Sequence, residues 1–118
     1  MPRTPAPDPL RPVELDILLT LTQGERHGYA IIQETEAREG GTRLETATLY
    51  RALKRLVEAG FVRPSEPGRA SGESDERRRY YAITPAGRAA ARAEALRLER
   101  LVGHARAARL LPEQGDSR

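Results

Sequence analysis

The fold is decided by residues 44–81, which read LETATLYRALKRLVEAGFVRPSEPGRASGESDERRRYY. When the first part of this stretch is placed on a helix, Leu49, Leu53 and Leu56 fall on one face. The opposite face carries Thr48, Arg51, Lys54 and Arg55. We therefore expect a helix over residues 46–59 that packs through one side and presents cations on the other.

A β-hairpin is expected directly after this helix. Gly60 suits the left-handed position that follows a helix's last turn. Residues 61–63 then start a strand, residues 67–76 form a turn with Gly and Ser, and residues 77–83 are strand-like. The last run opens with three arginines, Arg77, Arg78 and Arg79. Two basic patches on a helix and a hairpin suit one nucleic-acid surface.

Two further helices are expected upstream. Pro12 suits the first turn of a helix over residues 12–21, which is apolar on nearly all sides and should lie buried at the centre. A second helix is expected over residues 28–38, ended by Gly40 and Gly41. Its inward side chains are expected to be Tyr29, Ile31 and Ile32.

The final helix has the clearest start, because Thr84 is a good N-cap and Pro85 suits the first helical position. We expect it over residues 85–111, a length on the order of 40 Å that exceeds what so small a domain can cover. Small and apolar residues recur along it at steps of three and four: Ala91, Ala95, Leu98, Leu101, Val102, Ala105 and Ala108. Such a seam favours pairing with a second copy in a homodimer over a solvated Ala-rich helix.

The chain has 118 residues, which is enough for one domain with a small core. Its net charge is +3, and Lys54 is the single lysine among 20 basic residues. A pI near 9.8 and the bidentate chemistry of Arg favour a polyanionic partner, although a genome-wide bias toward Arg and Ala explains the composition equally well. The expected divisions are a flexible arm at 1–9, a winged helix domain at 10–84, a dimerisation helix at 85–111 and a tail at 112–118.

Several function classes find no support in the sequence. The absence of cysteine excludes disulfides, thiol catalysis and cysteine-ligated metals. His27 and His104 have no carboxylate cluster around them, and Ser71 and Ser74 have no base nearby. We expect no catalytic residue, metal or cofactor. No apolar run approaches the ~20 residues of a membrane span, and no secretion signal is present, so a cytoplasmic location is the simplest expectation.

Three helices followed by a hairpin make a winged helix-turn-helix, in which the third helix enters the major groove and the hairpin follows the DNA backbone. More specific motifs occur in order along the chain: Leu18-Leu19, His27-Gly28-Tyr29, Thr48-Leu49-Tyr50-Arg51-Ala52-Leu53-Lys54-Arg55-Leu56 with Gly60, Arg78-Arg79-Tyr80-Tyr81, and Ile83-Thr84-Pro85-Ala86-Gly87. Together they closely resemble the PadR family of bacterial transcription regulators, over about residues 13–100.

The resemblance implies a homodimeric repressor that binds an inverted-repeat operator in duplex DNA, from the compact branch of the family with a single C-terminal helix. One departure concerns the start of the recognition helix, where the family usually has Ser-Pro-Gly and this chain has Glu45-Thr46-Ala47. We expect Thr46 to cap the helix instead.

The residues expected to contact DNA are Tyr29, Thr48, Tyr50, Arg51, Lys54, Arg55, Arg77, Arg78 and Arg79. Arg51 is the expected base reader. Tyr50 either donates to a phosphate or fills the edge of the core. Each wing arginine either meets the DNA backbone or forms an ion pair with Asp75 or Glu76. The rival interpretation is a winged helix that docks on proteins and does not bind DNA.

A small-molecule effector is also considered. All five aromatic side chains fall in the DNA-binding half, so the seam of the last helix is poorly equipped to stack a planar cationic dye. A pocket there would favour an aliphatic or anionic molecule near Arg92, Arg97 or Arg100, and a regulator with no ligand is equally consistent with the sequence.

Overall fold

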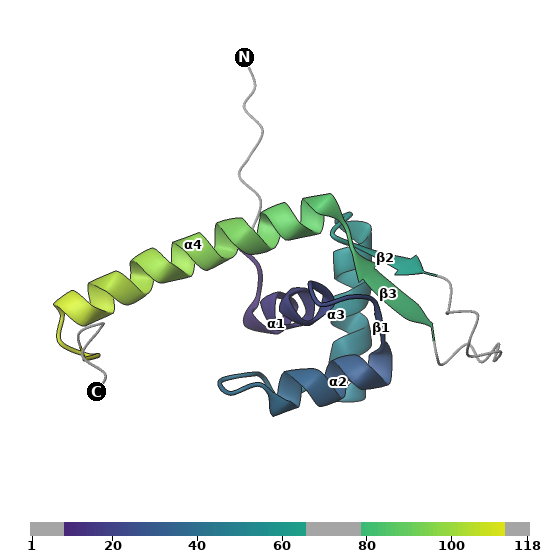
Figure 1. Ribbon diagram of the computed structural model, residues 1–118, viewed down its shortest axis with the longest axis horizontal. Coiled ribbons are helices and arrows are strands. Elements are labelled where there is room, and N and C mark those ends of the chain that lie inside the picture. Colours follow the sequence, from purple (N-terminus) through teal and green to yellow (C-terminus); the bar gives the residue numbers. More distant parts are fainter. Residues whose placement is uncertain (1–8, 66–78, 113–118) are drawn as a thin grey trace, which may run out of the picture.

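The computed structural model describes residues 9–65 and 79–112, and Figure 1 shows how their elements are arranged. The four helices and three strands follow the order α1 (Pro12–Leu21), β1 (Arg26–His27), α2 (Gly28–Ala37), α3 (Thr46–Glu58), β2 (Val62–Ser65), β3 (Tyr80–Ile83) and α4 (Pro85–Ala107). The expected class, mainly helical with a hairpin and a long last helix, is confirmed.

The sheet is antiparallel and contains one strand more than the sequence predicted. β3 lies in the middle, with β2 and β1 on its two sides. In the hairpin Val62 lies opposite Ile83, and on the other edge Arg26 lies opposite Tyr81. A two-residue strand leaves no alternating pattern in the sequence, so β1 could not be recognised before its partner strand was placed.

The core lies where α1 crosses α2, α3 and the sheet. Its fully buried members come from these four parts: Ile17, Leu18, Leu21, Ile31, Leu49, Leu53, Leu56 and Val62. The predicted apolar face of α3 is therefore confirmed. The expectation for α1 was wrong at Leu19, which is 39% exposed beside α4 rather than buried.

α4 begins as predicted, since the Thr84 hydroxyl oxygen accepts a hydrogen bond from the Gly87 amide at 3.0 Å. It ends at Ala107, earlier than expected, because Arg109 adopts a left-handed backbone with φ 66° and turns the chain back. Its 23 residues extend about 34 Å. Figure 1 shows the first half of α4 above α1 and the second half reaching past the rest of the fold.

Two local expectations on helices were also wrong. Tyr29 does not face inward: its side chain is 65% exposed, since α2 packs through Ile31. Thr46 does not cap α3; it is the first helical residue, and Glu45 occupies the N-cap position without a side-chain hydrogen bond to the helix. The expected arm, the hairpin turn with Arg69 and the tail from residue 113 lie outside the described residues.

Candidate nucleic-acid interface

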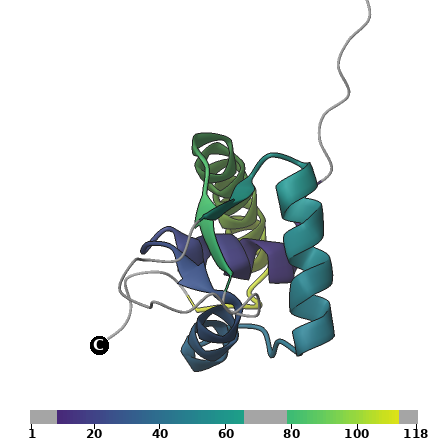
Figure 2. The ribbon, with the colours of Figure 1, turned by 90° about the vertical axis from the view of Figure 1, so that its right-hand side faces the viewer.

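α3 turns its polar face away from the body of the protein. Figure 2 shows the helix at one side of the molecule, with α1 against its inner side. Arg51 and Lys54 are exposed, and within residues 9–65 and 79–112 no ion pair engages either of them. Thr48 is half-buried. Two cations are therefore available to an external anion from the middle of α3.

Tyr50 packs against the start of α2. A Cβ atom added to Gly28 would lie 2.3 Å from the Tyr50 hydroxyl and 3.3 Å from Leu49 Cδ2, so only glycine leaves room for this contact. The Tyr50 side chain is still 39% exposed. Of the two roles considered for Tyr50, the structure shows the packing role directly, and the outer part of the ring stays accessible.

Arg55 is held by a carboxylate of α1. Its Nε donates to Glu14 Oε2 at 2.9 Å, and the Glu14 side chain is only 5% exposed. The other Glu14 oxygen accepts the Arg11 amide at 2.9 Å, which fixes the start of α1. Arg55 therefore links α3 to α1 through an ion pair, a role that the sequence did not indicate. Whether it also contacts DNA stays a prediction.

A shallow groove of about 290 Å³ separates α3 from the hairpin. Leu53, Val57 and Pro64 supply its apolar lining, and the charged ends of Lys54 and Arg79 stand at its rim. The two tyrosines, Tyr50 and Tyr81, line it as well. Burial raises the pKa of the Tyr81 phenol, and nearby Tyr50 raises it further, while Arg79 acts in the opposite direction. Lys54 of α3 and Arg79 of the wing thus line the same groove, together with the acidic Glu58.

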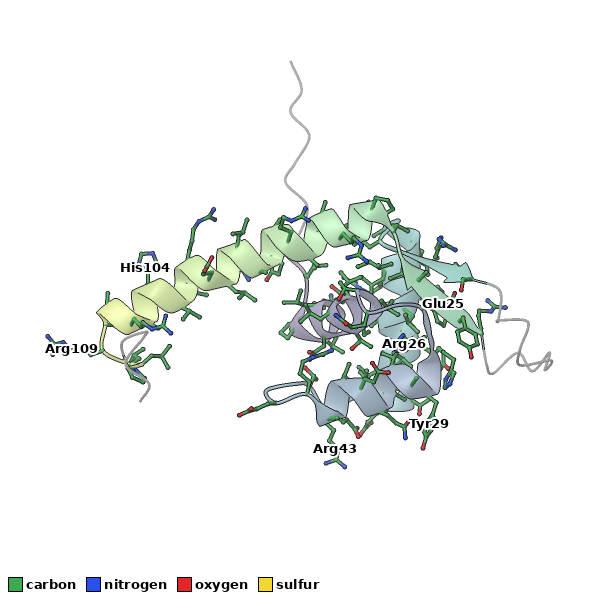
Figure 3. The ribbon with its side chains drawn as sticks, in the orientation of Figure 1. Glu25, Arg26, Tyr29, Arg43, His104 and Arg109 are labelled. Carbon is green, nitrogen blue, oxygen red and sulfur yellow. The ribbon has the colours of Figure 1, made fainter. Side chains whose placement is uncertain are left out.

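An aromatic group marks the junction between β1 and α2. His27 Nδ1 accepts the Ala30 amide at 3.2 Å and so caps α2. The His27 ring stacks parallel to Tyr29 at 6.5 Å and meets Tyr80 edge-on at 5.4 Å. Figure 3 shows Tyr29 pointing outward at the end of α2 nearest the wing. His27 therefore has a structural role, as the cap of α2.

The loop that leads into α3 is fastened to α1. One Asp16 oxygen accepts Arg38 Nη1 at 3.1 Å and the other accepts the Thr42 amide at 2.8 Å. Arg38 Nη2 also donates to the Thr20 hydroxyl at 2.8 Å. Leu44, immediately before α3, is buried in the core. These contacts fix where the recognition helix begins, although its cap differs from the one expected.

The expected DNA contacts divide into three groups. Arg51, Lys54 and Arg79 lie exposed on α3 and the wing, as the surface requires. Tyr29 is exposed on α2, whereas Tyr50, Thr48 and Arg55 are partly committed to packing or to Glu14. Arg77 and Arg78 lie outside the described residues. Sequence reasoning missed Glu14, because a carboxylate in a first helical turn looks like an ordinary solvated residue.

The expected dimer seam follows one side of α4. Ala91 is buried under α1 and Leu98 is half-buried, while Leu101 and Val102 are exposed beyond the domain. Ala95 is exposed and Ala105 half-buried. The first part of the seam thus packs on the protein's own core, and its later part is not covered by any of the described residues. Among the described residues no cluster with metal-ligand spacing occurs, and no helix is long and apolar enough to cross a membrane.

Comparison with protein families gives one match that covers most of the chain. Residues 17–93 match the transcriptional regulator PadR-like family. The match begins in α1 and ends in the first half of α4, so it includes α3 and the wing. A curated relative is an uncharacterised 37.1 kDa protein in transposon TN4556 of Streptomyces fradiae, 39% identical over 87 residues, which are 74% of this chain. The aligned part is 23% of that larger protein.

Solved structures share the fold. A transcriptional regulator from Clostridium thermocellum superposes with a TM-score of 0.64 and 27% identity, over 77% of this chain and 84% of that one. RosR of H. salinarum superposes with a TM-score of 0.57 and 28% identity, over 84% of this chain and 96% of that one. A PadR family regulator from Clostridium difficile superposes with a TM-score of 0.68 and 21% identity, over 80% of this chain and 94% of that one. At this low identity the similarity shows the fold alone.

Proposed function

Because the chain belongs to the PadR-like family of transcriptional regulators, we propose that it binds specific DNA sequences as a homodimer and represses transcription from an inverted-repeat operator. In this proposal α3 lies in the major groove and the wing follows the sugar–phosphate backbone. The regulator works on the chromosome, which places it in the cytoplasm.

The observation that carries the proposal is the free cationic face of α3. Arg51 and Lys54 are exposed, and Arg79 of the wing stands across a narrow groove from Lys54. A planar Arg side chain without an internal partner can bind guanine edges in bidentate fashion, and Lys54 and Arg79 suit phosphates. Lys54 and Arg79 line the same groove, and Arg51 precedes Lys54 by about one turn of α3, which supports a single duplex that meets all three cations.

The homodimer is supported by the uncovered seam on α4. Leu101 is 54% exposed and Val102 lies next to it. A symmetric pair of recognition helices would read two half-sites about one helical turn apart, which is the reason to expect an inverted repeat. Repression rather than activation follows from the family resemblance and depends on where the operator lies in the promoter.

The alternative, a winged helix that docks on another protein, predicts an apolar outer face on α3. That face carries Arg51, Lys54 and Glu58 instead. Fluorescence anisotropy of a labelled duplex decides between the two readings. For a DNA-binding protein, the logarithm of the binding constant falls linearly with the logarithm of salt concentration, by about 0.9 for each phosphate neutralised. Absence of duplex binding at low salt would contradict the proposal.

Sequence specificity needs a second experiment. Fragments bound from a sheared library of the host genome should share two inverted half-sites, and footprinting should protect both with a spacing of about 10 base pairs. The same protein should bind a scrambled fragment roughly 10³-fold more weakly or worse. If the recovered fragments shared no motif, the protein would bind DNA without sequence specificity, and the proposal that it regulates a defined operator would be wrong.

A further inference from the structure

The end of α4 carries a turn that exposes two leucines. After Ala107 the chain reverses at Arg109, whose φ of 66° is unusual for a residue with a side chain. The Leu110 amide donates to the Ala105 carbonyl at 2.9 Å, and Arg106 Nε donates to the Pro112 carbonyl at 3.0 Å. We call residues 108–112 the C-terminal hook. Leu110 is 76% exposed on it, and Leu111 is also exposed.

An apolar depression lies beside the middle of the same helix. Between α1 and α4 there is a trough of about 380 Å³ whose apolar side chains are Leu10, Pro12, Leu15, Leu19 and Leu98. Leu19 is the exposed large apolar side chain of α1, and it lies here. We call this depression the α1–α4 trough. It is wide enough for a leucine side chain or two and is not filled by the hook of its own chain, because the hook lies at the far end of α4 (Figure 1).

The register of a symmetric helix pair brings these two features together. The uncovered seam runs from Leu98 to Ala105, so a two-fold axis through its middle passes close to Leu101. When two copies of α4 pair antiparallel about that axis, positions equally far from it face each other. α4 ends at Ala107, six positions beyond Leu101, so this end of one copy lies opposite Ala95 of the other, next to Glu94, which lines the α1–α4 trough. The hook follows directly after Ala107.

The charges agree with this pairing. Arg109 projects from the hook at the tip of the molecule, as Figure 3 shows. Glu39 stands at the rim of the α1–α4 trough and is exposed. Within the described parts of the chain no ion pair engages Glu39 or Arg109, whereas the other rim charges Asp16 and Glu94 are paired with Arg38 and Arg97. One unpaired acid therefore remains on the trough and one unpaired base on the hook.

We propose that the C-terminal hook of one copy inserts Leu110 and Leu111 into the α1–α4 trough of a second copy, with Arg109 beside the partner's Glu39. The proposal rests on the homodimer of the proposed function and specifies which surfaces complete it. Each trough then receives apolar side chains that its own chain cannot supply, and a leucine pair gains burial at both ends of the dimer.

This arrangement connects the dimer contact to the recognition helix. The wall of the α1–α4 trough includes Asp16, Arg38 and Thr42, which are the residues that hold the loop before α3 on α1. A hook in the trough covers this hydrogen-bond network and shields it from water, which strengthens it. Loss of the hook therefore loosens the start of α3, and operator binding falls by more than the loss of dimerisation alone accounts for.

Cross-linking tests the contact directly, because the chain contains no cysteine that would give a background. Leu19→Cys protein is mixed with Leu110→Cys protein, allowed to exchange subunits and treated with a short bismaleimide. The mixture should give a covalent dimer on a denaturing gel. The matched control pairs Leu19→Cys with Leu96→Cys, since Leu96 is exposed on the opposite face of α4; this mixture should stay monomeric on the gel.

A charge exchange provides an independent check. Glu39→Arg and Arg109→Glu should each raise the dimer dissociation constant by about 3-fold, the size typical of an exposed ion pair, and the double variant should restore it. Sedimentation of the untreated proteins reports the oligomer itself. A dimer without the Leu19–Leu110 cross-link overturns the hook contact and leaves the homodimer intact. A monomer at all concentrations overturns both.

Discussion

α3 and α4 both carry an apolar side, but among the described residues only that of α3 is covered along its whole length. The apolar side of α3 is covered by α1 and the sheet, down to fully buried Leu49 and Leu53, and its other side carries free cations. α4 packs on α1 only over its first half and then exposes Leu101 and Val102 on the continuation of the same side. The polar face of α3 is therefore the surface that we propose for a polyanion, and the exposed apolar residues of α4 are the surface that we propose for a second copy.

The largest effect is expected from breaking the seam of α4. Replacing Leu98 and Leu101 together by Glu puts four like charges at the centre of the antiparallel pair, so sedimentation should find monomers. Loss of the second recognition helix should weaken binding to an inverted repeat on the order of 10²-fold or more. Leu96→Glu, on the opposite face, is the matched control and should remain dimeric. A dimer that survives the double change would place the interface elsewhere.

The same comparison shows what the sequence could predict. Helix α3 was predictable from its leucines, which are spaced by three and four, and from Gly60 after its last turn. The φ of Gly60 is 84°, the left-handed value expected at that position. Thr84 and Pro85 likewise located the start of α4, because capping is a local interaction. Contacts between distant segments were not predictable. The short strand β1 forms only by pairing with β3. Arg55 binds Glu14, which lies 41 positions earlier in the chain. Gly28 is required because the Tyr50 ring occupies the space of a Cβ atom.

Substitution of two glycines, one at a packed site and one at an exposed site, compares the two regions by their effect on stability. Gly28→Ala would force its methyl group into the Tyr50 hydroxyl and ring, so thermal or urea unfolding should show a loss of about 1–3 kcal/mol. Gly103→Ala, in the exposed half of α4 with no atom of another segment within 4 Å, should instead stabilise the protein by up to about 1 kcal/mol. Equal effects at both sites would contradict the packing described for Tyr50.

A smaller effect on stability is expected at Arg55. Arg55→Ala leaves the buried Glu14 carboxylate without its cationic partner, which should cost about 1–2 kcal/mol because the guanidinium itself is half in water. Arg51→Ala, one turn earlier, should change the free energy of unfolding by less than about 0.5 kcal/mol. Urea titration of both variants distinguishes them. If the two arginines behaved alike, the tie between α3 and α1 would contribute nothing measurable.

We propose that the exposed cationic face of α3 reads DNA, and the Arg51→Ala variant tests this role of α3. Its affinity for an operator fragment and for a scrambled duplex should be measured by anisotropy across a salt series, with Arg79→Ala as the matched wing variant. We predict that Arg51→Ala loses about 1–3 kcal/mol on the operator and little on the scrambled duplex. Arg79→Ala should weaken both duplexes alike and flatten the salt dependence by about one phosphate. Operator binding by a folded Arg51→Ala protein with wild-type affinity and preference would contradict the claim.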